Sequence, residues 1–157
     1  MENSLNVLSD SLDMKIEVLK DIQEYNEQQR KAFEEGEPDI DSFDEAIEAK
    51  GQLIERLERL DEGFEVLYEK VAEQLKEDRQ RYAAQIKAIQ DKITVITDMS
   101  VSIQAEEARN KKLIEQYFAN KRQDIKKSRI GSKAAYNYYK NMSGANVAAP
   151  QYMDSKK

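Results

Sequence analysis

Apolar residues recur at intervals of three and four positions through most of this 157-residue chain. In the first segment these positions are Leu5, Leu8, Leu12, Ile16, Leu19 and Ile22. Such spacing places the side chains on one face of an α-helix, because a helical turn takes about 3.6 residues. Gly and Pro number only 5 and 2, and 36% of the residues are charged, which favours long helices over turns. The sequence therefore predicts an all-α fold.

Turn signals interrupt the pattern near residue 36. The first helix is expected to stop at residues 35–38, because Gly36 can follow a helix end and Pro38 cannot continue a helix. Asp39, Asp41 and Ser42 can cap the next helix, and Ser42 with Glu45 matches the S-x-x-E capping box. A connection this short makes the first two helices antiparallel neighbours.

Beyond residue 63 the apolar stripe continues without Gly or Pro to residue 130. One helix of this length would span about 100 Å, so either part of it projects beyond its partners or it bends. Gly63 is expected to separate this stretch from the second helix, since Gly weakens a helix by about 1 kcal/mol. A bend is expected at residues 97–102, where Thr, Asp and Ser side chains compete for backbone hydrogen bonds. Together these features predict an elongated antiparallel bundle or coiled coil of three to four long helices.

Charge and composition change toward the C-terminus. Acidic residues outnumber basic residues in residues 1–110, and the balance reverses in residues 111–157. Gly, Ala and Pro in residues 143–157 are typical of a flexible end. We therefore predict a helical domain at residues 1–130 and a flexible basic tail at residues 131–157, which carries Tyr136, Tyr138 and Tyr139.

The residue inventory argues against catalysis. The chain has no Cys and no His, which removes thiolate and imidazole metal ligands and the usual general base near neutral pH. Adjacent carboxylates such as Glu106 and Glu107 point about 100° apart on a helix, so they cannot act together as an acid and a base. No glycine-rich phosphate-binding motif is present. We expect no enzyme activity, no cofactor and no metal site.

The basic region from Lys111 to Lys140 raises the possibility of nucleic-acid binding, because Tyr117 and Phe118 could stack on bases. The acidic remainder of the chain, with a net charge of −6 overall, would repel a polyanion, so nucleic acid is not the expected partner. The N-terminal segment lacks the basic and apolar regions of a signal peptide, and no run of about 18 apolar residues exists. We expect a cytoplasmic protein without membrane insertion.

The apolar stripe is the best candidate for a binding surface. A bundle with helices of unequal length leaves part of its stripe uncovered, and such a groove accepts the amphipathic helix of a partner. Two alternatives remain open. The stripe could be consumed within the protein's own core, or it could be buried in a homodimer, which would make the chain a self-associating helical scaffold.

Several runs along residues 1–142 carry a family resemblance when they are taken together. They are the leading helix from Leu5 to Phe33, residues 49–57 and 60–64, residues 93–103, residues 106–110 with Lys112, and residues 138–142. In this order they resemble the flagellar export chaperones of the FlgN type, which are similar to the FliT-like type III secretion chaperones.

This resemblance implies a cytoplasmic chaperone that binds the C-terminal helical segment of a late flagellar substrate. The substrate would be a hook-associated (junction) protein or the filament cap protein, which the chaperone would keep unassembled and deliver to the export gate. The implied groove is on the later helix, at Ile96, Ile103, Leu113, Ile114, Tyr117, Phe118 and Ile125. Tyr136, Tyr138 and Tyr139 in the tail would dock to an export gate component or cover the empty groove.

Overall fold

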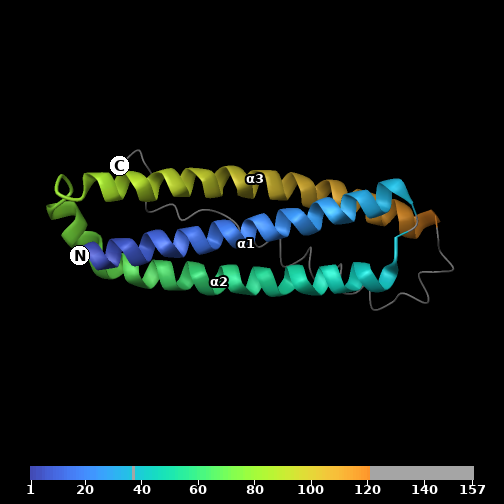
Figure 1. Ribbon diagram of the computed structural model, residues 1–157, viewed down its shortest axis with the longest axis horizontal. Coiled ribbons are helices and arrows are strands. Elements are labelled where there is room, and N and C mark those ends of the chain that lie inside the picture. The colour runs from blue at the N-terminus through green and yellow to red at the C-terminus, as the bar shows by residue number, and fades with distance from the viewer. Residues whose placement is uncertain (37, 121–157) are drawn as a thin grey trace.

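The computed structural model describes residues 1–36 and 38–120, and three long helices account for nearly all of them (Figure 1). The helices are α1 (Glu2–Glu35), α2 (Ile40–Glu77) and α3 (Ala83–Asn120). No strand occurs in this part of the chain. The all-α prediction is confirmed. A fourth helix and the predicted tail at residues 131–157 lie outside the described residues.

The three helices lie side by side in an elongated bundle, and α1 lies between α2 and α3 in the view of Figure 1. Contacting residues of α1 and α2 are 46 positions apart at Lys15–Asp61 but 21 apart at Gln29–Lys50, as antiparallel neighbours require. Contacting residues of α1 and α3 stay 79 to 84 positions apart, so this pair is parallel. The antiparallel prediction thus fails for α1 and α3, because the first and third helices of an up-down-up bundle point the same way.

Each helix buries one stripe with the alternating three-and-four spacing of a coiled coil. In α1 the buried stripe is Leu5, Leu8, Leu12, Lys15, Leu19, Ile22, Asn26 and Gln29, with Val18 buried beside it. In α2 it is Phe43, Ile47, Lys50, Ile54, Leu57, Phe64, Val71 and Leu75. In α3 it is Ile89, Ile93, Ile96, Ser100, Ile103, Glu107, Asn110 and Ile114. The core therefore runs along the length of the bundle and includes several polar residues.

The first connection forms where the turn signals predict it. Helix α1 ends at Glu35, and Asp39 caps α2 by accepting a hydrogen bond of 3.1 Å from the backbone N–H of Asp41. The Ser42 hydroxyl donates to the same carboxylate at 2.8 Å. The capping box with Ser42 as the cap is therefore wrong, because the helix has already begun at Ile40.

The second connection lies at residues 78–82, so the predicted break at Gly63 and the predicted bend at residues 97–102 are both wrong. Gly63 is exposed inside α2, and its cost of about 1 kcal/mol is small beside the burial of Phe64 and its neighbours. In α3 the hydroxyls of Thr97 and Ser100 donate to carbonyls one turn earlier, at 2.9 and 2.8 Å. These bonds satisfy the hydroxyls without ending the helix.

Replacing Gly63 by Ala should stabilise the protein by about 0.5–1 kcal/mol, because Ala is the better helix former. A Cβ at this position meets no atom within 4 Å, so no clash offsets the gain. Urea denaturation followed by circular dichroism measures the change. A loss of stability in this variant would mean that α2 is interrupted at residue 63.

Candidate partner-binding site

Three of the predicted groove residues lie in the hydrophobic core. Ile96 and Ile103 are completely buried, and Ile114 is 4% exposed. A partner cannot reach these side chains without separating the helices, so the structure corrects the expectation that they line an open groove. The physical reason is that their stripe on α3 packs against the neighbouring helices along most of its length.

Leu113, Tyr117 and Phe118 differ from these residues, because all three are only partly buried near the last turn of α3. Their partial exposure keeps them as candidates for partner binding. The seventh groove residue, Ile125, and the three tail tyrosines, Tyr136, Tyr138 and Tyr139, lie outside the described residues.

Four rings from the three helices meet at one end of the bundle, and we call this cluster the aromatic end: Phe33, Phe43, Tyr117 and Phe118. The ring of Phe33 lies 5.5 Å from that of Phe43 and 5.4 Å from that of Tyr117, both edge to face. Phe118 completes the cluster at 6.3 Å from Phe43 and 5.5 Å from Tyr117. Edge-to-face contacts at these distances are favourable for aromatic rings.

The order of the helices explains why these rings come together. In an up-down-up bundle the end of α1, the start of α2 and the end of α3 share one end of the molecule (Figure 1). Phe43 is 4% exposed and forms the floor of the cluster, whereas Phe33, Tyr117 and Phe118 form a partly exposed rim. Phe33 and Phe43 were not among the site residues predicted from the sequence. The sequence feature that could have identified them is their position on either side of the turn at residues 36–39.

A buried polar layer lies beside the aromatic end, and it consists of Asn26, Gln29, Lys50, Glu107 and Asn110. The Lys50 ammonium is fully buried and donates to Asn26 Oδ1 at 2.7 Å, to Gln29 Oε1 at 2.8 Å and to Glu107 Oε1 at 3.0 Å. The side-chain amide of Asn110 donates to the backbone carbonyl oxygen of Asn26 at 2.9 Å. Burial lowers the pKa of Lys50, and the charge of Glu107 opposes this shift.

This polar layer joins all three helices, which fixes how they align along the bundle. A buried polar group is costly unless its partners are in place, so a sliding of any helix by one turn would leave Lys50 or Glu107 without its partners. Buried polar residues set register in coiled coils in the same way. The signal in the sequence was that Lys50 falls on the apolar spacing between Ile47 and Ile54.

A second ion pair, which is only partly buried, lies farther along the bundle. The Lys15 ammonium, 1% exposed, donates to Asp61 Oδ1 at 2.8 Å. Burial raises the pKa of Asp61, and the charge of Lys15 opposes the shift. This pair links α1 to α2 and adds to the alignment set by the polar layer.

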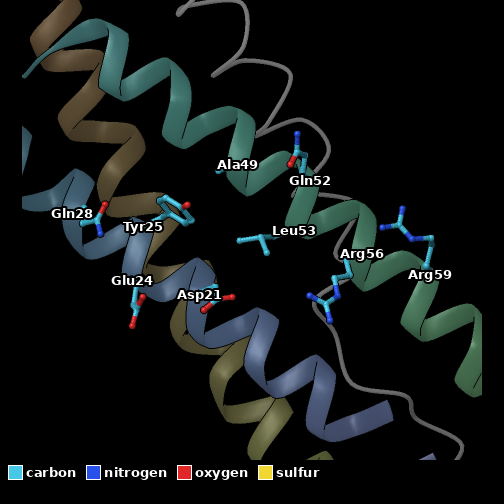
Figure 2. A pocket seen from close by; sticks show the side chains of 9 residues that line it. All are labelled: Asp21, Glu24, Tyr25, Gln28, Ala49, Gln52, Leu53, Arg56 and Arg59. Atoms are coloured by element: carbon cyan, nitrogen blue, oxygen red, sulfur yellow. The ribbon is translucent and has the colours of Figure 1, made fainter. Parts of the chain in front are cut away.

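An open groove between α1 and α2 is a separate surface feature (Figure 2). We call it the outer groove, and its volume is about 730 Å³. Its lining residues are Asp21, Glu24, Tyr25 and Gln28 of α1 and Ala49, Gln52, Leu53, Arg56 and Arg59 of α2. Charged and polar side chains predominate, which differs from the largely apolar lining of most small-molecule sites.

Within residues 1–36 and 38–120 no group of three or more His, Cys, Asp or Glu side chains could hold a metal ion. None of the three described helices is long and apolar enough to cross a membrane.

Comparison with known families agrees with the resemblance drawn from the sequence. The family model of the FlgN protein matches residues 1–144, which include all three helices, the Lys50–Glu107 and Lys15–Asp61 ion pairs and the aromatic end. No curated protein and no solved structure matches the chain. Because the family match covers most of the sequence, the chain belongs to the FlgN family, a family of flagellar export chaperones.

Proposed function

We propose that this protein is a cytoplasmic flagellar type III export chaperone. It binds the C-terminal helical segment of a late substrate, either a hook-filament junction protein or the filament cap protein. It keeps that substrate unassembled and delivers it to the export gate. Family membership supports the chaperone role. The partial exposure of the aromatic end supports it as the site where the substrate binds.

The aromatic end suits the apolar face of a guest helix. Phe33 and Phe118 pack against the core, and Tyr117 packs against the ring of Phe33. All three are partly exposed, so a guest helix would extend the core rather than replace it. Burial of apolar surface contributes about 25 cal/mol per Å², and aromatic anchors commonly dominate such interfaces. The guest would present its anchors at positions i, i+3, i+4 and i+7.

The polar layer gives this site a fixed base. Gln29 lies four residues before Phe33, and Asn110 lies seven residues before Tyr117, so the layer is one to two helical turns inside the aromatic end. Side chains beyond the layer can repack around a guest while Lys50 and Glu107 hold the helices in register. A substrate whose apolar helix is covered in this way is prevented from assembling with other copies.

Replacing both Tyr117 and Phe118 by Ala should weaken binding of the substrate segment at least tenfold, because loss of aromatic anchors costs about 2 kcal/mol or more. Isothermal titration calorimetry with the C-terminal segments of the junction and cap proteins measures the dissociation constant. Circular dichroism should show that the variant keeps its helices, since both residues lie in the last turn of α3.

The matched control is Val101→Ala, a substitution on the same helix at a side chain that is 63% exposed and outside the aromatic end. It should leave binding unchanged. If the unsubstituted protein binds neither segment, the proposed substrate class is wrong. If Val101→Ala weakens binding as much as the double substitution, the site is not the aromatic end.

A further inference from the structure

Buried polar atoms without a hydrogen-bond partner gather near the aromatic end. Within residues 1–36 and 38–120 these atoms are Gln29 Nε2, Asp44 Oδ1 and Arg109 Nη2. Asp44 directly follows Phe43 in the sequence. Gln29 and Arg109 lie four and eight residues before rings of the cluster, which is at most about 12 Å along a helix. Because folded proteins satisfy most buried polar atoms, such a concentration indicates a site that binding completes.

Buried polar groups farther along the bundle do have partners. The Lys15 ammonium donates to Asp61 Oδ1 at 2.8 Å, and the Ser100 hydroxyl donates to the backbone carbonyl oxygen of Ile96 at 2.8 Å. The missing partners are therefore a local property of the aromatic end and its surroundings, and they do not reflect loose packing of the whole bundle.

Two of the three residues are already held by neighbouring side chains. Gln29 Oε1 accepts a hydrogen bond of 2.8 Å from Lys50, and the Gln29 side chain is only 4% exposed, so a guest cannot reach it. Arg109 donates through its Nε to Asn110 Oδ1 at 3.2 Å. Asp44 is the remaining candidate for a contact with a guest.

The Asp44 carboxylate lacks a compensating charge. No salt bridge within the described residues uses it. Burial and the negative charge of nearby Asp41 raise the pKa of Asp44. A cation placed beside Asp44 would supply the missing hydrogen bond and offset the repulsion from Asp41 at the same time.

The position of Asp44 on α2 leaves it accessible to a guest at the aromatic end. Leu53 lines the outer groove, and Asp44 lies nine residues before it. Nine residues make about two and a half turns, so Asp44 lies on the side of α2 away from the outer groove. It is partly exposed there and flanks Phe43, whose ring contacts Phe118 of α3. A guest helix that packs on Phe118 from this side would have side chains within reach of the Asp44 carboxylate.

We infer that Asp44 selects guest helices that carry a Lys or Arg beside their apolar anchors, and that this cation pairs with the Asp44 carboxylate in the complex. Such selection depends on the proposed binding of a guest helix at the aromatic end. The cation would lie three or four positions from an anchor, because side chains at that spacing are neighbours on a helix. Its aliphatic stem would cover the ring of Phe118 while its charged head reaches Asp44.

The same carboxylate disfavours guests that lack the cation. A guest with apolar anchors alone would cover Asp44 Oδ1 further and leave it without a partner, which costs free energy. A guest with an acidic residue at this place would add a second like charge beside Asp41 and Asp44. Discrimination between helices of similar apolar pattern commonly uses such penalties together with favourable contacts.

The substitution Asp44→Asn in the full chain tests this role. Calorimetric titration with the C-terminal segments of the junction and cap proteins should show binding about tenfold weaker, because the guest cation loses its partner. Urea denaturation should show that the free protein is no less stable, since the lost carboxylate had no partner. The control is Glu45→Gln, which removes an exposed charge from the same turn of α2 and should leave binding unchanged.

Substitutions in the guest identify the paired residue. Each Lys and Arg of the bound segment is replaced by Met, one at a time. One replacement should weaken binding to the unsubstituted chain about tenfold but change binding to the Asp44→Asn variant by less than about twofold, as a direct pair requires. Exchanging the charges, with Asp44→Lys in the chain and Glu at that position of the guest, should restore the binding that either change alone removes.

The outcomes separate this role of Asp44 from the proposed function. Asp44 selects nothing if Asp44→Asn binds like the unsubstituted chain, and the chaperone function still stands in that case. Equal weakening by Asp44→Asn and Glu45→Gln would also overturn the pairing, because general attraction to an acidic surface would explain both. So would the absence of any guest residue that couples to Asp44. If the unsubstituted chain binds neither segment, the proposed function is wrong and the pairing is wrong with it.

Discussion

Replacing Lys50 by Met should lower the free energy of unfolding by about 3–5 kcal/mol, as measured by urea denaturation. The substitution removes the cation that lies 3.0 Å from Glu107 Oε1 in the core. Glu107 is 5% exposed, so its carboxylate would remain buried without the charge that compensates it. The oxygens of Asn26 and Gln29 would lose the same donor, which adds the cost of unsatisfied buried acceptors.

Lys87→Met is the matched control for this prediction. Lys87 forms an ion pair of 2.7 Å with Asp91, but the two side chains are 72% and 61% exposed. Surface pairs of this kind contribute about 0–1 kcal/mol, so the control should change stability by less than 1 kcal/mol. Equal effects of the two substitutions would mean that water reaches Lys50 and that the polar layer is not buried in solution.

A double substitution separates the value of the ion pair from the cost of breaking it. The variant Lys50→Met/Glu107→Met should recover much of the stability that Lys50→Met loses, because apolar pairs of similar volume can replace buried ion pairs at little cost. Such a recovery would show that the polar layer contributes more to the alignment of the helices than to the free energy of unfolding.

Local signals in the sequence were enough to predict the helices but not every boundary. The spacing from Leu5 to Ile22 specified α1, and the cap at Asp39 was visible because capping depends on residues a few positions apart. The break predicted at Gly63 is wrong, because the prediction considered the low helix propensity of Gly without the packing of the whole helix. In such a long helix, the burial of one stripe outweighs one unfavourable residue.

The candidate site was harder to predict, because the apolar spacing shows which side chains share a face but not what covers that face. Ile96 and Tyr117 belong to the same stripe of α3. Ile96 lies where all three helices run side by side, whereas Tyr117 lies where α1 ends and α2 begins. The level at which the core gives way to an exposed end depends on the lengths and register of the partner helices, and the register depends on buried polar residues such as Lys50.

The position of Ile103 gives the sharpest test of this distinction between core and site. Ile103→Ala should lower the free energy of unfolding by about 2–5 kcal/mol, because the side chain is completely buried and its truncation leaves a cavity. Binding of the substrate segment by the folded protein should stay the same. Ile103 lies fourteen residues before Tyr117, which places it about 21 Å along the helix from the aromatic end.

Urea denaturation and calorimetric titration of the same preparation measure both quantities for Ile103→Ala, at a temperature where the variant remains folded. Val101→Ala provides the comparison on the exposed side of α3, and it should alter stability by no more than about 0.5 kcal/mol. A different result is informative in a specific way. If Ile103→Ala weakens substrate binding and leaves stability unchanged, the stripe of α3 is open to partners in solution, and the substrate enters between the helices instead of packing on the aromatic end.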